Sequence, residues 1–163
     1  MKPATYWIDH LGLEPHPEGG YYKETYRSSA QVSFPDYQDQ RNVSTGIYFL
    51  LTKGNFSAFH RIKSDEMWHF YAGDSVSIFI IYPTGELKEI RLGLDLENGE
   101  VPQAVVPANC WFASKVSITG KYGLVGCTVA PGFDFIDFEM AKQTKLISRF
   151  PEHTELILSL TRA

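Results

Sequence analysis

Two histidines and two carboxylates fall within ten residues of a segment that is otherwise rich in aromatic side chains. They are His60, Asp65, Glu66 and His69. Side chains along an extended strand alternate between its two faces. His60 and Glu66 therefore share one face if the turn between them keeps the register, whereas His69 lies on the other face unless a bulge re-aims it. The spacing predicts an imidazole and a carboxyl group directed into one apolar cavity.

A histidine beside a carboxylate in an apolar cavity can have a pKa suited to proton transfer near neutral pH. We therefore predict that His60 is a general base and that Glu66 orients its ring or acts as a second acid. A tyrosine would donate a proton, with Tyr22, Tyr26 and Tyr48 as candidates and Tyr26 assigned the catalytic role. The alternative is that the pair is a satisfied polar contact inside a β-barrel.

Aromatic and polar side chains near this pair are candidates for ligand binding, because aromatic faces can stack on a sugar or another ring. The alternatives are that the tryptophans belong to the core and that the other carboxylates are solvated. His16 lies between two prolines and is interpreted as a turn residue. The predicted binding residues are Glu18, Tyr22, Glu24, Tyr48, Trp68, His69, Phe70 and Trp111.

Composition restricts the class of protein. A chain of 163 residues with 44% hydrophobic side chains fits a single domain over residues 1–163 with a sizeable core. The net charge of -4 and the lack of a long basic run argue against nucleic-acid binding. Cys110 and Cys127 lie in apolar segments, as buried free thiols do. The sequence has no apolar leader and no apolar run of about 20 residues, so we expect a cytoplasmic protein with no membrane contact.

Short apolar runs separated by turn signals predict an all-β sandwich or barrel. A short helix is expected at 3–13 and another at 151–161, with a short helix or turn within 138–150. The Asn-Gly pair at 98–99 predicts a type I′ hairpin, and the polar residues 30–41 predict a loop that could act as a mobile flap. The expected strands are 21–28, 45–52, 56–60, 75–82, 87–92, 103–106, 111–114 and 122–130.

The spacing of His60, Glu66 and Gly73 resembles the first cupin motif, which has two histidines separated by one residue, then Glu and Gly. Ile62 stands at the second histidine position. The second cupin motif is Pro-x-Gly-x-x-His. Here Pro107 is kept, but Asn109 replaces the glycine, and Phe112 replaces the histidine.

Within the cupins, the chain resembles the DUF985 (Cupin_5) family over nearly its whole length. The resemblance implies a double-stranded β-helix, or jelly roll, with short N- and C-terminal helices, and a homodimer. The stretches that carry the resemblance are 13–22, 24–28, 59–61, 64–70, 106–111, 125–133 and 150–151.

Because two of the metal-ligand positions of the cupins are changed, we predict neither a metal nor another cofactor. Cupins that resemble the deoxysugar epimerases work without a metal. The resemblance therefore implies a metal-independent epimerase or isomerase that acts on a sugar-derived or other small polar substrate. Two alternatives stay open. One is a metal-dependent cupin enzyme in which His60, Glu66 and His69 hold a weakly bound metal, and the other is a non-catalytic protein that binds a small molecule.

Overall fold

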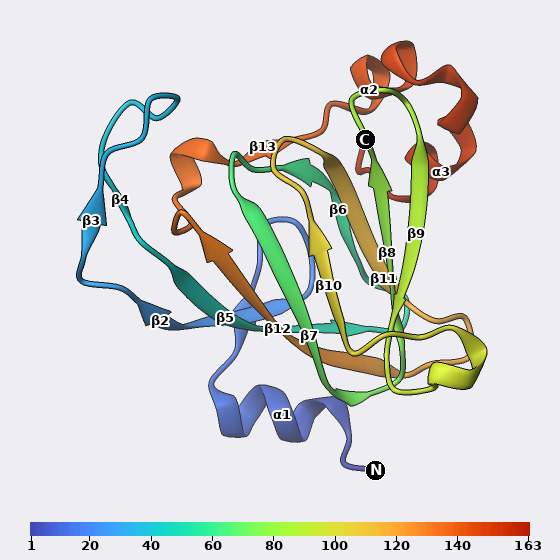
Figure 1. The fold of residues 1–163 in the computed structure, drawn as a ribbon. Coiled ribbons are helices and arrows are strands. Elements are labelled where there is room, and N and C mark those ends of the chain that lie inside the picture. The colour runs from blue at the N-terminus through green and yellow to red at the C-terminus, as the bar shows by residue number, and fades with distance from the viewer.

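The computed structural model describes residues 1–163 and shows two antiparallel sheets that face each other as a roll (Figure 1). The larger sheet carries the N-terminal strands and the segment with Glu66. In spatial order its strands are β1 (Glu14–Pro15), β2 (Tyr21–Arg27), β5 (Thr45–Thr52), β12 (Tyr122–Ala130), β7 (Asp65–Gly73) and β10 (Gln103–Val106).

The smaller sheet carries His60. Its strands in spatial order are β13 (Glu139–Met140), β6 (Phe56–Arg61), β11 (Trp111–Val116), β8 (Val76–Ile81) and β9 (Leu87–Leu92). Together the two sheets confirm the predicted all-β jelly roll.

The main core fills the space between the two sheets. Inward side chains of the large sheet, such as Phe49, Leu51 and Trp68, pack against Ile78 and Ile80 of the small sheet. Phe49 and Leu51 on β5, and likewise Ile78 and Ile80 on β8, are two positions apart, because inward and outward side chains alternate along a strand.

Helices cover the outer faces of the roll at both ends of the chain, as predicted. Helix α1 (Ala4–Leu11) packs on outward residues of β5 and β12, including Leu50 and Leu124. At the other end, α2 (Gln143–Arg149), the 3-10 turn η3 (Pro151–His153) and α3 (Thr154–Ser159) form a second core with the outer face of the small sheet. None of the helices is long and apolar enough to cross a membrane.

The predicted type I′ hairpin at Asn98-Gly99 is wrong. The chain there forms a 3-10 turn, η1 (Leu96–Asn98), in which the backbone N–H of Asn98 donates to the side chain of Asp95. Gly99 ends the turn in the left-handed conformation. The capping carboxylate offers the backbone a local alternative to a two-residue hairpin, so the chain passes from β9 to β10 without pairing the two strands.

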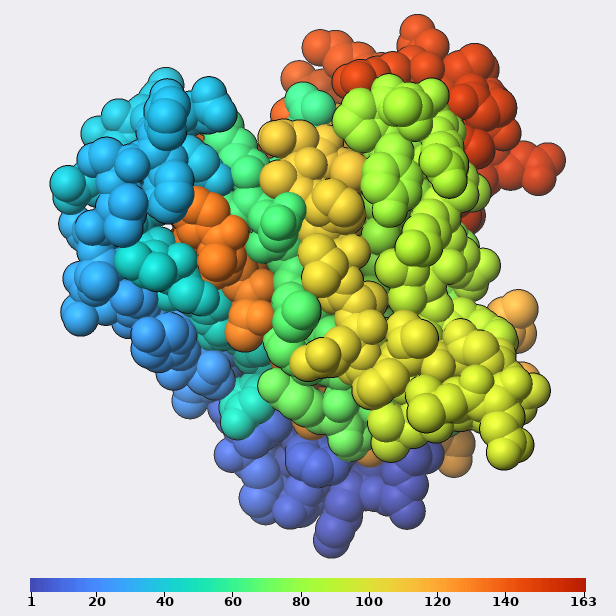
Figure 2. Space-filling model, viewed as in Figure 1, coloured from blue at the N-terminus to red at the C-terminus, as the bar shows by residue number.

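Residues 28–44 form an arm that stands out from the roll at the upper left of Figure 2. The sequence predicted a loop here, and the structure adds a small hairpin of β3 (Gln31–Val32) and β4 (Arg41–Asn42). The arm is tied to the roll by a buried ion pair, in which Arg41 Nε lies 2.7 Å from Asp137 Oδ2. Asp137 belongs to the 3-10 turn η2 (Phe135–Asp137), so the same contact also holds that turn in place.

Candidate functional site

A cavity of about 30 Å³ remains inside the roll; we call it the central cavity. Two histidines and two glutamates line it, from three different parts of the chain: His16 and Glu18 from the loop before β2, His60 from β6 and Glu66 from β7. The alternation predicted for His60 and Glu66 therefore does bring both side chains to one cavity. Glu18, His60 and Glu66 are all buried.

The partner of His60 is Glu18, not Glu66. His60 Nε2 lies 2.8 Å from Glu18 Oε2, and His60 Nδ1 lies 2.7 Å from the carbonyl oxygen of Ala58. A carbonyl oxygen only accepts, so Nδ1 carries a proton. Nε2 and the carboxyl group of Glu18 must then share one more proton, because two bare acceptors would repel each other at this distance.

The shared proton is best placed on the imidazole, as an imidazolium–carboxylate pair. Burial alone lowers the pKa of His60, but the charge of Glu18 and its hydrogen bond outweigh burial and raise the pKa above its usual value. Burial conversely raises the pKa of Glu18, and the charge and hydrogen bond of His60 bring it below the usual value. Both ring nitrogens of His60 are thus occupied at neutral pH, so the ring is not a free base.

Glu66 is the carboxyl group that is available to react. Burial, reinforced by the negative charge of Glu18, raises its pKa to about 7, although His60 and a hydrogen bond from Trp68 act in the opposite direction. Trp68 Nε1 donates to Glu66 Oε2 over 3.1 Å, and no hydrogen bond within the chain reaches Oε1. At pH 7 this carboxyl group is therefore present in both its protonated and its ionised form.

His16 lies beside this group, in contrast to its interpretation as a turn residue alone. Its Nδ1 accepts a hydrogen bond from the backbone N–H of Glu18 over 3.1 Å. Burial lowers the pKa of His16, with Glu18 raising it by less, so the ring is neutral at pH 7. The His-x-Glu spacing between two turn signals is the sequence feature that could have indicated this role.

Apolar side chains close the rest of the central cavity. Phe138 stacks on His60 with 5.2 Å between ring centroids, and Phe133 packs beside Phe138. Cys127 also lines the cavity, and burial together with the nearby carboxylates raises the pKa of its thiol well above the usual value. The thiol is therefore protonated and not a nucleophile.

The sequence profile described as Cupin superfamily (DUF985) matches residues 5–141. This chain belongs to that cupin family. It is also 35% identical over 148 residues to an uncharacterised protein of Saccharomyces cerevisiae, a match that covers 83% of this chain and 73% of the yeast protein.

Solved structures agree with this assignment. A protein from Shewanella oneidensis is 45% identical, with a TM-score of 0.90 and 99% of both chains covered. A hypothetical protein from Leishmania major is 36% identical, with a TM-score of 0.94, and the match covers 99% of this chain and all of the other. Oxalate decarboxylase from Bacillus subtilis is 15% identical with a TM-score of 0.55, over 91% of this chain and 37% of the other, and shows the fold alone.

The residues of this cupin do not fit a resident metal. Ile62 and Phe112 occupy the two positions where the cupin motifs have further histidines, and both are buried apolar side chains. The Phe112 ring packs on His60 with 4.1 Å between ring centroids. The nitrogens of His60 are already hydrogen-bonded, and His69 lies outside the central cavity. No three His, Cys, Asp or Glu side chains gather in a way that could hold a metal ion.

Four of the predicted site residues lie away from the central cavity. A bulge between Glu24 and Tyr26 changes the register of β2 against β5, and Tyr26 is 57% exposed. Tyr48 packs on the outer face of the large sheet near α1. His69 is on that face too, with its Nε2 3.0 Å from Thr128 Oγ1. Trp111 belongs to the second core under the C-terminal helices.

The other predicted binding residues lie closer to the central cavity. Trp68 donates a hydrogen bond to Glu66, and Phe70 packs against the main core. Tyr22 and Glu24 line an outer groove of about 350 Å³ that shares Ile47 and Phe133 with the central cavity. Phe133 therefore stands between the groove and the titratable groups.

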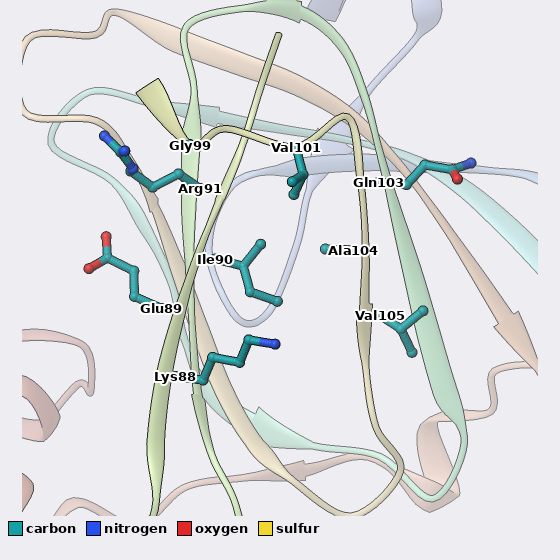
Figure 3. Close-up of a pocket in the computed structure, with 9 residues that line it drawn as sticks. All are labelled: Lys88, Glu89, Ile90, Arg91, Gly99, Val101, Gln103, Ala104 and Val105. Atoms are coloured by element: carbon teal, nitrogen blue, oxygen red, sulfur yellow. The ribbon is translucent and has the colours of Figure 1, made fainter. Parts of the chain in front are cut away.

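A larger hollow, of about 530 Å³, lies elsewhere, between the edge strands β9 and β10 (Figure 3). Two of its three charged side chains have partners: Glu89 accepts from Ser77 Oγ over 2.8 Å, and Arg91 donates to the carbonyl oxygen of Asn98. The hollow is wide and has no cluster of buried titratable groups. It therefore offers no site for acid–base chemistry.

The loop that carries Glu18 depends on a glycine. Gly19 has a φ of +111°, and a Cβ there would collide with the carbonyl oxygen of Phe56. We expect Gly19→Ala to destabilise the fold by at least about 2 kcal/mol, since it combines a strained φ with a backbone clash. Urea denaturation would measure the change.

The matched control is Gly54→Ala. Gly54 also has a positive φ, of +82°, but a Cβ there would meet nothing within 4 Å. This substitution should cost only the strain of the left-handed backbone, of the order of 1 kcal/mol. Equal losses in the two variants would show that close packing at Gly19 is unimportant.

Proposed function

We propose that this cupin is a metal-independent enzyme of the isomerase or epimerase type, which moves a proton to and from a carbon next to a carbonyl group of a small polar substrate. The observation that carries the proposal is the free carboxyl oxygen of Glu66, whose pKa is about 7, in the same cavity as the His60–Glu18 pair. A base that titrates near the working pH transfers protons most effectively.

The side chains take complementary roles in this proposal. The ionised form of Glu66 removes the proton. The positive charge of the His60 imidazolium, whose two N–H groups stay bonded to Glu18 and to the carbonyl oxygen of Ala58, stabilises the oxyanion that forms on the substrate. Glu18 keeps His60 protonated through the contact of 2.8 Å. Glu66 then returns the proton to the same carbon after the substrate has turned its other face to the carboxyl group, or to the former carbonyl carbon while the neighbouring hydroxyl proton moves to the oxyanion. This proposal differs from the expectation from the sequence, in which His60 was the base and Glu66 oriented it. Glu66 is now the base, and Glu18 orients His60.

The size of the central cavity limits the substrate. A volume of about 30 Å³ is far below the roughly 300 Å³ of common small-molecule sites. The outer groove of about 350 Å³ is large enough for a ring, and rotation of Phe133 would connect it to the central cavity. We therefore propose a substrate with a small carbonyl end for the cavity and a polar body that lies in the groove, between Tyr22 and Phe133.

Exchange with solvent deuterium tests this proposal directly. Pyruvate, dihydroxyacetone and D-glyceraldehyde would each be incubated with the protein in D₂O, and loss of the proton next to the carbonyl followed by proton NMR. We expect exchange above the buffer background with at least one compound, and a decrease of about a hundredfold or more in Glu66→Gln, as for removal of a general base.

Tyr26→Phe is the control, because this side chain lies outside the cavity and should leave exchange unchanged. Exchange that persists in Glu66→Gln would contradict the assignment of the base. Compounds that raise the melting temperature of the wild type and yet show no exchange would assign the central cavity to binding alone.

A further inference from the structure

A second concentration of charge lies on the outer face of the small sheet, away from the central cavity. His60 and Arg61 are neighbours on β6, so their side chains point to opposite faces of the sheet. Arg61 opens onto a groove of about 290 Å³ between this sheet and α2. We call it the helix groove; the residues that matter in it are Arg61, Trp111, Glu139, Lys142, Lys145 and Arg149.

The helix groove has more positive than negative charge. Only Arg61 is neutralised, through a contact of 2.8 Å between its Nε and Glu139 Oε2. Lys142, Lys145 and Arg149 have no carboxylate within salt-bridge distance, and all three are exposed. Lys145 and Arg149 are four positions apart and therefore lie on one side of α2, and Lys142, the residue just before the helix, lines the same groove. A chain with a net charge of -4 thus keeps three unpaired cations along one groove.

A second observation also indicates an anionic ligand. Trp111 lines the groove, is only 8% exposed, and its indole N–H has no hydrogen-bond acceptor in the protein. Buried polar hydrogens without a partner are uncommon, because each costs free energy. The guanidinium of Arg61 lies over the indole ring, 4.5 Å from its centroid. A ligand that drew Arg61 away from the ring would give the indole N–H access to an acceptor oxygen.

We infer that the helix groove binds a phosphorylated small molecule. Phosphate oxygens carry negative charge and accept hydrogen bonds, as three cations and a free indole N–H require. Arginine binds phosphate through paired N–H groups and lysine as a point charge. The volume of about 290 Å³ is at the lower end of small-molecule sites. This site is independent of the proton-transfer chemistry proposed for the central cavity.

The inference is tested with inorganic pyrophosphate as the probe, titrated into the whole protein at about 0.15 M ionic strength, where charges at the open surface are largely screened. Calorimetry would measure the dissociation constant, and ¹⁵N-labelled protein would report on the Trp111 indole N–H. We expect saturable binding, a shift of the Trp111 indole resonance, and binding at least about tenfold weaker in the double variant Lys145→Gln, Arg149→Gln.

The matched control is the double variant Lys53→Gln, Lys121→Gln, which removes the same charge from exposed positions elsewhere and should bind like the wild type. Equal weakening in both double variants, or a titration that does not saturate, would overturn the inference. Citrate and heparin are titrated in parallel. Binding of citrate without pyrophosphate would assign the groove to carboxylates, and binding of heparin alone would assign it to a macromolecule, and either result would overturn the proposed ligand class.

Discussion

Glu18→Ala is expected to destabilise the fold by about 3–5 kcal/mol, the usual cost of removing one partner of a buried ion pair. His60 Nε2 lies 2.8 Å from Glu18 Oε2 with both side chains buried, so the variant leaves a buried imidazole without its counter-charge. Urea denaturation followed by tryptophan fluorescence would measure the free energy of unfolding. The pKa of His60, followed by NMR, should fall, because burial is then no longer opposed by Glu18.

The loss should also depend on pH. The pKa of Glu18 is lowered in the fold from an ordinary 4.5, so its contribution to stability is present above pH 4.5 and is lost as the pH falls through the lowered value. The pKa of His60 is raised from 6.5, so its contribution is present below pH 6.5 and is lost as the pH rises through the raised value. The effect of Glu18→Ala should therefore be greatest between about pH 4.5 and 6.5, and should decline above pH 6.5 as the pH rises through the raised pKa of His60.

Glu139→Ala is the control for this experiment. The distance between Arg61 Nε and Glu139 Oε2 is also 2.8 Å, but this pair is open to solvent. Exposed pairs contribute about 0–1 kcal/mol. If the two variants lost the same stability, the buried pair would not be the contact that holds the loop of Glu18 against the roll.

Glu66→Gln is expected to stabilise the protein at alkaline pH, although it removes the proposed base. The pKa of Glu66 is raised from 4.5 to about 7, which means that the folded state binds this proton more tightly than the unfolded chain. Wild-type stability from this group is therefore complete below pH 4.5 and is lost as the pH rises through about 7. At about 1.4 kcal/mol for each unit of pKa, the loss reaches roughly 3 kcal/mol above pH 8.

Glutamine keeps the shape and the acceptor oxygen for Trp68 but cannot ionise. The difference in unfolding free energy between Glu66→Gln and wild type should thus be small at pH 4.5 and approach the full value at pH 8.5. The same substitution at the exposed Glu97 should change stability little at either pH. A difference for Glu66→Gln that stays constant with pH would mean that Glu66 does not titrate near 7 in the fold.

Much of the fold was predictable from the sequence. Short apolar runs such as 45–52 and 122–130, together with the turn signals between them, indicated a roll of short strands, and the family resemblance specified a jelly roll. The alternation of 60–70 also placed His60 and Glu66 on the cavity side and His69 on the outside. These predictions succeed because the side-chain period of a strand is a local property of the backbone.

Local alternation failed where the backbone departs from a regular strand. The bulge between Glu24 and Tyr26 turned the predicted catalytic tyrosine to the outer face. The cap made by Asp95 replaced the predicted hairpin at Asn98-Gly99 with a 3-10 turn. The bulge adds a residue to one strand and so changes which face the following residues occupy, whereas the cap competes with the hairpin for backbone hydrogen bonds.

The sequence by itself determined that an imidazole and a carboxyl group share the interior of a β-roll. Only the tertiary structure decided that His60 pairs with Glu18, which leaves Glu66 as the free acid with a pKa of about 7. It also placed His16 beside this group and brought Arg61 next to the cations of α2. Charge partners and pKa values depend on distances between segments that are remote in the chain, and on burial, and neither is encoded in local periodicity.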